Sequence, residues 1–375
     1  MARLGDIATY INGYAFKPSD WSDTGLPIIR IQDLTGNLYQ ANRYNGEYAP
    51  KYEVNDGDVL ISWSASLGVY VWHGEKALLN QHIFKVVFDK TEISKPFFVH
   101  QVENILDKAT SEAHGATMKH LTKPVFDALP FYLPPIDEQR TIAAVLDKVS
   151  GLIAKRRQQL DKLDEIVKAK FVEMFGDPLD EGCRYQKVPL GVVADVGSSK
   201  RIFEKEYVSS GVPFYRTKEI VELSKGHKIT TELFITKERF AEICDEYGAP
   251  QKGDLLISAV GTIGVIWIVD GKNDFYFKDG NLLRVSVSNN FNPVYLKMLL
   301  ETLIAAHKQK MSVGTAYAAL TISMLKEMMV YLVPIDEQNQ FAAFVKQTEK
   351  TKNTISRSLE KLETLKKALM QEYFG

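Results

Sequence analysis

The feature of the sequence that most constrains the fold is a duplicated segment. The stretch PIDEQ occurs at residues 135–139 and again at 334–338, each time opening a run of apolar residues at helical spacing. In context, the first copy reads LPPIDEQRTIAAVLDKV over 133–149 and the second reads LVPIDEQNQFAAFVKQT over 332–348. A repeat with so long a period predicts a chain assembled from two versions of one structural unit.

The similarity extends over most of the two halves, residues 1–176 and 187–375. The matched pairs, in chain order, are RLGDIATYINGYAF (3–16) with PLGVVADVGSSKRIF (189–203), GLPIIRIQDL (25–34) with GVPFYRTKEI (211–220), DGDVLISWSASLGVYVW (56–72) with KGDLLISAVGTIGVIWI (252–268), ISKPFFVHQV (93–102) with NFNPVYLKML (290–299), and HGATMKHLTKPVFDALPFYLPPIDEQ (114–139) with VGTAYAALTISMLKEMMVYLVPIDEQ (313–338). The offset grows from 186 to 199 along the chain. Insertions in surface loops of the second copy explain such growth.

Each half combines strands with helices. Val, Ile and aromatic residues broken by Gly-Asp, Asn-Gly and Asp-Gly turns predict a β-rich module in the first ~130 residues. The apolar runs DVLISW and DLLISA each follow a Gly-Asp turn, as buried strands do. PFFVHQVENILDKAT and PVYLKMLLETLIAAHKQK begin with proline and are predicted helices. The fold class is therefore expected to be α+β.

A long helix is expected after each module. Pro135 and Pro334 suit the first helical turn, and the Asp and Glu that follow complement the helix dipole. Apolar residues then recur at spacings of 3, 4 or 7 with charged flanks, which predicts two helices that pack on each other. The stretch 150–174 would be about 38 Å long, close to one turn of B-DNA. The charged flanks are most simply solvated helix faces.

Composition bounds the remaining classes. A length of 375 residues favours two domains, and 45% hydrophobic with 25% charged residues is ordinary for a water-soluble protein. The absence of an apolar run of about 20 residues and of an N-terminal apolar segment predicts a cytoplasmic protein. Cys183 and Cys244 lie far apart, so neither a disulfide framework nor a thiolate zinc site is expected. The seven histidines show no metal-ligand spacing.

The order and duplication of these motifs resemble the specificity subunit of type I restriction-modification enzymes. The motifs are LGDIA…GYAFK, GDVLIS and LPPIDEQRTIAAVLDKV, with a long helix after each module, and they cover nearly the whole chain. The resemblance implies two β-rich globular target recognition domains, each reading half of a bipartite asymmetric DNA site. They would be separated by an antiparallel pair of long coiled-coil helices with pseudo-two-fold symmetry, which sets the spacer. The domains would be 1–134 and 179–333, and the helical regions 135–178 and 334–375.

The same resemblance implies partners and a division of labour. The subunit would have no catalytic site, no metal and no cofactor. It would bind double-stranded DNA and dock two adenine-N6 methyltransferase subunits and two motor-endonuclease subunits, which use AdoMet, ATP and Mg²⁺. The net charge of −1 departs from the basic excess usual for DNA-binding domains. DNA binding is therefore expected to depend on the partner subunits.

Several catalytic motifs are absent from the sequence. The chain has no Asn/Asp-Pro-Pro-Tyr/Phe methyltransferase tetrapeptide, no P-loop and no zinc deaminase signature. Asp254 with Asp270-Gly271-Lys272 loosely resembles a metal-dependent nuclease core, but VDGKND is also a turn sequence between strands. A two-domain coiled-coil scaffold for proteins is a second alternative. The specificity subunit of a related type II (IIB/IIG-like) methyltransferase-nuclease is a third.

Polar side chains on loops of a rigid sheet are the candidates for DNA contact, because base edges and phosphates are bound by such groups. In the first half these are Lys17, Arg30, Gln32, Ser62, Ser64, Gln81, His82, Lys119 and His120. In the second half they are Ser198, Ser199, Lys200, Arg201, Arg216, Lys218, Lys278, Lys308, Lys310 and Tyr317. Two alternatives are left open. Arg30 and Arg216 would equally suit structural ion pairs with Asp33 and Glu219, and Trp63 is expected in the core rather than stacked on a base.

Overall fold

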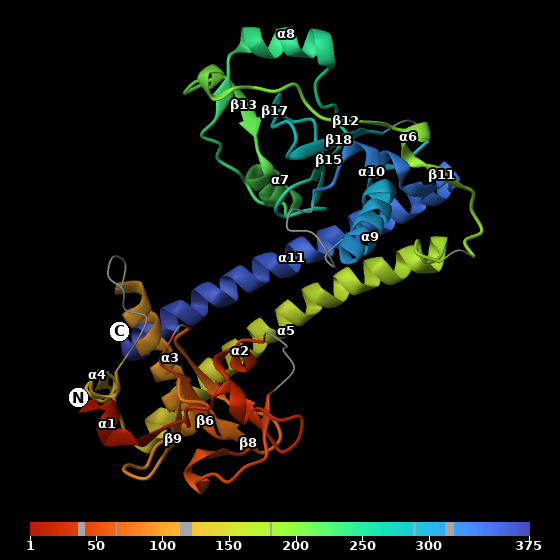
Figure 1. The fold of residues 1–375 in the computed structure, drawn as a ribbon. Helices are drawn as coiled ribbons and strands as arrows, with labels where there is room; N and C mark the ends of the chain where they lie inside the picture. Colours follow the sequence, from red (N-terminus) through yellow and green to blue (C-terminus); the bar gives the residue numbers. More distant parts are fainter. Residues whose placement is uncertain (37–41, 65, 113–121, 181, 288–289, 312–318) are drawn as a thin grey trace. The chain divides into compact units, whose positions relative to one another are not determined.

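The computed structural model describes the chain except residues 37–41, 65, 113–121, 181, 288–289 and 312–318 (Figure 1). The chain divides into two compact units. The first comprises Met1–Gln158 and Ser356–Gly375, and the second comprises Gln159–Ile355. Each unit holds one β-rich module and part of each of two long helices.

The first module is built on two small sheets. One sheet is antiparallel and has the order β2 (Thr9–Asn12), β9 (Ile83–Val87), β6 (Val59–Ser62) and β7 (Gly68–Val71). The other has the order β4 (Arg43–Tyr44), β3 (Leu26–Ile29), β8 (Ala77–Leu79) and β5 (Glu53–Val54), in which β3 and β8 are parallel. A short pair joins β1 (Ala2–Arg3) to β10 (Pro130–Phe131). All four residues of β6 are buried, which confirms the strand predicted from DVLISW.

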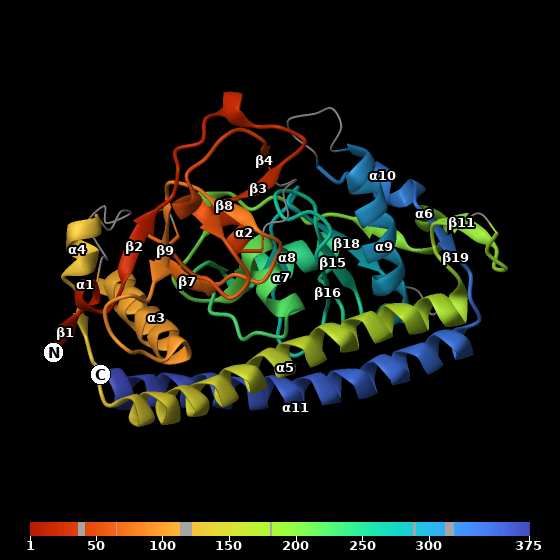
Figure 2. The same cartoon turned by 90° about the horizontal axis from the view of Figure 1, so that it is seen from below.

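The described residues of the first module also form four helices. They are α1 (Leu4–Ile7), α2 (Ile31–Leu34), α3 (Lys95–Glu112) and α4 (Lys123–Asp127), with 3₁₀ turns at Pro18–Asp20 and Pro50–Tyr52. The predicted helix at PFFVHQVENILDKAT is α3, which lies beside β9 (Figure 2). Its Phe97 and Phe98 are fully buried in the core that also contains Ile61 and Phe84.

The second module repeats the topology of the first. Its antiparallel sheet has the order β12 (Asp195–Gly197), β18 (Leu282–Ser286), β15 (Leu255–Ser258) and β16 (Ile266–Ile268). The other sheet has the order β14 (Phe234–Ile235), β13 (Val212–Tyr215) and β17 (Tyr276–Phe277), again with a parallel β13–β17 pair. β11 (Lys187–Pro189) pairs with β19 (Met329–Tyr331). The helices are α6 (Leu190–Val193), α7 (Thr217–Ser224), α8 (Lys237–Tyr247), α9 (Pro293–Met311) and α10 (Ile322–Glu327), with a 3₁₀ turn at Glu204–Glu206.

The insertion in the second copy packs in a small separate core, and both copies share a closely packed glycine. The extra residues between the second and third matched segments form α8, whose Phe240 and Ile243 pack in a small separate core of the second unit. The glycines that follow Leu4 and Leu190 lie close to other side chains of their modules. A Cβ on Gly5 would lie 3.1 Å from the Asp127 Cβ, and one on Gly191 would lie 2.9 Å from the Lys326 Cβ.

The two long helices, α5 (Ile136–Phe175) and α11 (Ile335–Phe374), are continuous over 40 residues each. Both begin directly after the proline of PIDEQ, as predicted. The expected 38 Å length, taken from residues 150–174, was wrong. A 40-residue helix is about 60 Å long, and its first four turns belong to the repeated PIDEQ segment. The match with a single turn of B-DNA therefore does not hold.

Within each unit the two helices run antiparallel. In the first unit, Ile142 and Leu146 near the start of α5 share a core with Met370 near the end of α11. In the second unit, Phe171 near the end of α5 contacts Phe341 near the start of α11, with ring centroids 5.4 Å apart. The α+β class, the internal repeat and the antiparallel helices are confirmed. None of the helices in the described parts of the chain is both long and apolar enough to cross a membrane.

Candidate nucleic-acid interface

The two modules share a turn that fixes the geometry of their central strands. The Asn55 amide donates to the Asp58 carboxylate at 2.9 Å, and the Gln251 amide donates to the Asp254 carboxylate at the same distance. Burial raises the pKa of Asp254. Asp254 therefore caps a turn that Asp58 caps in the first copy of the repeat, as a structural residue does. Asp270 instead pairs with Lys272 inside its own turn, at 2.8 Å. The geometry supports the turn interpretation of VDGKND over a nuclease core.

Two segments of the second unit bring five of the predicted DNA contacts together. They are the 198–203 loop, which follows β12, and the 278–281 turn, which precedes β18. Ser198 Oγ donates to the Leu282 carbonyl at 3.0 Å and accepts from the Gly280 amide at 3.2 Å. Ser199 Oγ donates to the Phe277 carbonyl at 2.6 Å. The two serines therefore fasten the loop to the turn, and Lys200, Arg201 and Lys278 are carried on that frame.

Lys200 is held by the inserted helix α8. Its backbone amide donates to the Tyr276 hydroxyl at 2.9 Å, and its ammonium donates to the Tyr247 hydroxyl at 2.9 Å. The ammonium also lies 4.7 Å from the centroid of the Tyr247 ring. The hydrogen bond to Tyr247 raises the pKa of Lys200. Tyr247 was not predicted from the sequence, because it belongs to the insertion and has no counterpart in the first half.

Arg201 lies beside a hollow of about 380 Å³. Its Nε donates to the Asp279 carboxylate at 2.8 Å, while 68% of its side chain remains exposed. The hollow is lined by Arg201, Ile202, Phe203, Glu204, Tyr207, Lys278, Asp279, Gly280 and Asn281. Asp279, Asn281 and the exposed Phe203 were missed by sequence reasoning. Comparing the loop with its counterpart in the first half would have drawn attention to them.

The equivalent segments of the first unit are the 13–17 loop and the 80–82 turn. There the amide of Gly13 donates to the Ile83 carbonyl at 3.2 Å and the amide of Tyr14 to the Leu79 carbonyl at 2.8 Å. In the first unit, backbone hydrogen bonds therefore hold the loop against the turn, whereas in the second unit the hydroxyls of Ser198 and Ser199 do so. Lys17 is exposed at the end of the loop, and its amide donates to Asp20 at 2.7 Å, as that of Phe203 does to Glu206 at 2.8 Å.

The first unit also brings candidates from separate strands together. The Trp63 ring lies 5.4 Å from the His82 ring and 5.7 Å from Phe84, and its Nε1 donates to Asn12 at 3.2 Å. Trp63 packs against the core, as expected, but is only partly buried. Gln81 adjoins His82 and is half-buried. The cluster therefore presents an amide, an imidazole and an indole edge where β2, β6 and β9 meet.

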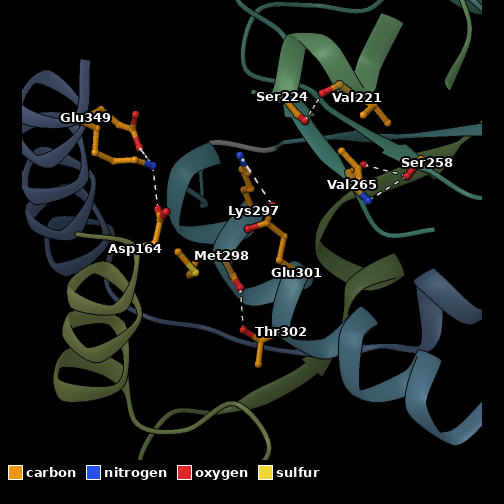
Figure 3. Close-up of polar contacts among 11 residues, drawn as sticks. Asp164, Val221, Ser224, Ser258, Val265, Lys297, Met298, Glu301, Thr302 and Glu349 are labelled. Carbon is orange, nitrogen blue, oxygen red and sulfur yellow. Dashed lines mark hydrogen bonds and ion pairs between the residues drawn. The ribbon is translucent and has the colours of Figure 1, made fainter. Parts of the chain in front are cut away.

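Two predicted contacts are buried. Ser62 is fully buried, and its hydroxyl donates to the carbonyls of Ser66 and Gly68. Its counterpart Ser258 is bonded in the same way to the carbonyls of Thr262 and Val265. Figure 3 shows the contact between Ser258 and Val265. Ser64 is 5% exposed. The hydroxyl of Ser62 is thus already engaged by the strand-end turn.

The two matched arginines differ in their partners. Arg216 forms a forked pair with the buried Glu219, with Nη2–Oε1 at 3.0 Å and Nε–Oε2 at 3.4 Å, and the hydrogen bonds that Arg216 donates to Glu219 raise the pKa of Arg216. The structural ion pair considered for Arg216 is confirmed. Arg30 instead lies over the Trp21 ring at 4.4 Å, while its backbone amide binds Asp33. Gln32, on α2, is half-buried, and Lys218, on α7, is exposed.

The remaining candidates lie elsewhere. Lys308 is exposed in the last turn of α9, and Lys310 belongs to the same helix. Lys119, His120 and Tyr317 fall outside the described residues. The DNA contacts of the whole set remain predictions.

The PIDEQ motif has a structural role that sequence reasoning did not find. Gln338 is fully buried. Its Nε2 donates to the backbone carbonyls of Val333 and Asn290, and its Oε1 accepts from the backbone amide of Asn292 at 2.8 Å. Gln139 does the same in the first unit, donating to the Pro134 carbonyl at 2.8 Å and accepting from the Ser94 amide at 3.0 Å. The glutamine therefore ties the start of each long helix to its module.

Charged pairs connect the helices within each unit. In the second unit, the Lys352 ammonium lies between Asp164 at 2.8 Å and Glu349 at 3.3 Å (Figure 3). In the first unit, Arg157 pairs with Glu363 at 2.7 Å. Some of the predicted solvated charges are thus interhelical partners. In the described parts of the chain, no cluster of three or more His, Cys, Asp or Glu could hold a metal ion.

These observations define a class of protein: a tandem repeat of one α+β module, with variable polar loops on a common sheet and two long antiparallel helices. Comparison with known proteins specifies the family. The sequence profile described as the type I restriction modification DNA specificity domain matches residues 1–165 and 184–366. The chain belongs to this family, the specificity subunits of type I restriction-modification systems.

Curated relatives agree. A putative type I restriction enzyme specificity subunit of Haemophilus influenzae is 29% identical over 89% of this chain and 86% of its own length. The specificity subunit of the type I restriction enzyme EcoBI of Escherichia coli is 26% identical over 72% of this chain. The match spans about half, 53%, of that relative's length.

Solved structures show the same fold at low identity. The S subunit of a type I restriction-modification system from M. genitalium is 14% identical with a TM-score of 0.55, covering 100% of this chain and 95% of that one. A chain from a type I R-M system solved to describe complex assembly is 17% identical with a TM-score of 0.56, covering 100% and 96%.

Proposed function

We propose that this chain reads a bipartite, asymmetric DNA site, one half with each module, and that it is itself non-catalytic. The observation that carries the proposal is the pair of equivalent loops. The 13–17 and 198–203 loops leave the same edge of the same sheet but carry different side chains. A constant scaffold with variable loops is how one fold recognises different sequences.

The long helices would set the spacer between the half-sites. Each is a single continuous helix, and within each unit the pair is fixed by apolar and charged contacts. Rigid helices transmit length, so the number of residues in them would determine how far apart the two readings fall. The helices would also dock the partners, which we propose are two methyltransferase subunits and two motor-endonuclease subunits.

The chemistry is assigned to those partners. In this proposal AdoMet, ATP and Mg²⁺ are used by the methyltransferase and motor subunits, and this chain binds no cofactor. The net charge of −1 also supports shared DNA binding, because phosphate contacts by cationic side chains supply most non-specific affinity. Alone, the chain would bind DNA weakly.

Methylation sequencing tests the proposal. The chain is co-expressed with its methyltransferase, and the methylated bases in host DNA are mapped; one bipartite motif with a fixed spacer is expected. The purified chain alone should neither methylate nor cut DNA. A continuous motif, or robust activity of the isolated chain, would contradict the proposal.

A variant separates spacing from recognition. Inserting or deleting residues in α5 between 150 and 174 should alter the spacer and leave both half-sites unchanged. A changed half-site with an unchanged spacer would show that the helices do not act as the ruler.

A further inference from the structure

We propose that Arg201, oriented by Asp279, reads the guanine of a G·C pair in the half-site bound by the second module. The inference rests on the proposed function and assigns to one residue a base-reading role rather than a phosphate contact. Its starting point is the bond from Arg201 Nε to the Asp279 carboxylate, 2.8 Å long.

The bond leaves the useful edge of the guanidinium exposed. Arginine has five N–H donors in a planar fork, and the pair of Nη groups matches the O6 and N7 acceptors of guanine. Asp279 engages Nε, and its side chain is only 16% exposed while that of Arg201 is 68% exposed. The carboxylate therefore orients the Arg201 side chain through Nε and leaves the Nη groups exposed to solvent.

The frame beneath the pair is rigid. Asp279 belongs to the turn that Ser198 clamps through the Gly280 amide, and Arg201 belongs to the loop that Ser198 and Ser199 fasten. Gly280 has φ of +69°, which favours glycine at that point of the turn. Both partners are thus carried by segments joined to each other, which is the preorganisation that specific recognition needs.

The charge of the surroundings favours a base edge over a phosphate. The hollow is lined by two cations, Arg201 and Lys278, and by two carboxylates, Glu204 and Asp279. A phosphate site requires an excess of positive charge. Base edges present donors and acceptors without net charge, so a mixed site suits them better.

The pair is also specific to one copy of the repeat. Arg201 lies three residues before the 3₁₀ turn at Glu204, and the residue in the same place in the first unit is Ala15. Asp279 lies three residues before β18, and its equivalent is Asn80. The first module folds the same way without this pair, so the fold does not depend on it. The second module has Arg201 and Asp279 where the first has Ala15 and Asn80. Two modules that read different half-sites would need such a difference in side chains.

The test uses the full chain with its methyltransferase, and methylation of a random-sequence DNA library as the readout. Wild type should require G·C at one position of one half-site. Arg201→Ala should reduce discrimination at that single position about 10–100-fold, and leave the other half-site unchanged. Arg201→Lys keeps the charge but lacks the fork, so it should lose the same discrimination. Lys272→Ala, which breaks the exposed Lys272–Asp270 ion pair of the same module at 2.8 Å, is the matched control and should leave the motif intact.

Asp279→Asn distinguishes orientation from simple stability. It should relax the same G·C position while binding to non-specific DNA becomes stronger, because a negative charge is removed near the phosphates. Retention of full discrimination by Arg201→Lys, or a half-site without G·C, would overturn the inference. If a bipartite motif is found but these variants do not alter one base, the inference fails and the proposed function stands. If no bipartite motif is found, the proposed function itself fails.

Discussion

Replacing the buried glutamine of the second PIDEQ copy should destabilise the junction between module and helix. Gln338→Leu keeps a similar side-chain volume but removes the bonds to Val333, Asn290 and Asn292. Asn290 is exposed, so its carbonyl regains water. The buried Val333 carbonyl and the partly buried Asn292 amide do not regain it readily.

The magnitude follows from those two groups. A buried backbone group left without a partner costs about 1–3 kcal/mol, so Gln338→Leu should lower the free energy of unfolding by about 2–6 kcal/mol. Gln139→Leu should lower it by a similar amount, because Gln139 also engages two backbone groups, the Pro134 carbonyl and the Ser94 amide.

Hydrogen exchange is the appropriate assay, since it reports the free energy of opening locally in each unit. In Gln338→Leu, protection should fall in residues 295–300 of α9 and at the start of α11, while the first unit keeps its protection. Gln340→Leu is the control: Gln340 is exposed on the same helix, and its replacement should change stability by less than about 0.5 kcal/mol. The reasoning is refuted if the two variants behave alike.

Two further predictions concern charge in the first unit. The pKa of Glu103 is held below its usual value of 4.5, chiefly by the His100 imidazole, whose Nδ1 lies 3.7 Å from Oε2, and also by the Lys366 ammonium. The ionised Glu103 carboxylate therefore stabilises the fold above pH 4.5, and this contribution is lost as pH falls through the lowered pKa. Lys366→Met removes part of the contribution, so this variant should lose less stability over the same acid range. Thermal melts at stepped pH measure the difference. Arg157→Ala should reduce stability by less than about 1 kcal/mol in urea titrations, because the Arg157–Glu363 pair is exposed to water, and a larger loss would contradict this estimate.

Much of the fold could be predicted because it depends on local patterns. The Gly-Asp turns, the apolar runs of β6 and β15 and the proline at the start of α5 act over a few residues, so the sequence carries their signal directly. The repeat strengthened these predictions, because each motif occurs twice and the two copies predict the same element. The helix length was misjudged because the two apolar patterns of α5 were measured separately, although nothing between them interrupts the helix.

The polar network was harder to predict because its partners are distant in sequence. Arg201 and Asp279 are 78 residues apart, and Gln338 and Asn292 are 46 apart. A single residue gives no indication of which carboxylate will face it. Ser62 and Ser198 were both predicted as DNA contacts by residue type, yet their hydroxyls bind carbonyls of their own module.

The sequence by itself determined that the chain is a tandem repeat of an α+β module with two long helices, because periodicity and duplication are written along the chain. Only the tertiary structure decided which loops share an edge and which side chains are already engaged. That is because strand pairing brings together segments separated by insertions of unequal length. Arg201 was one candidate of many in the sequence, and in the folded unit it is an exposed fork held by an aspartate.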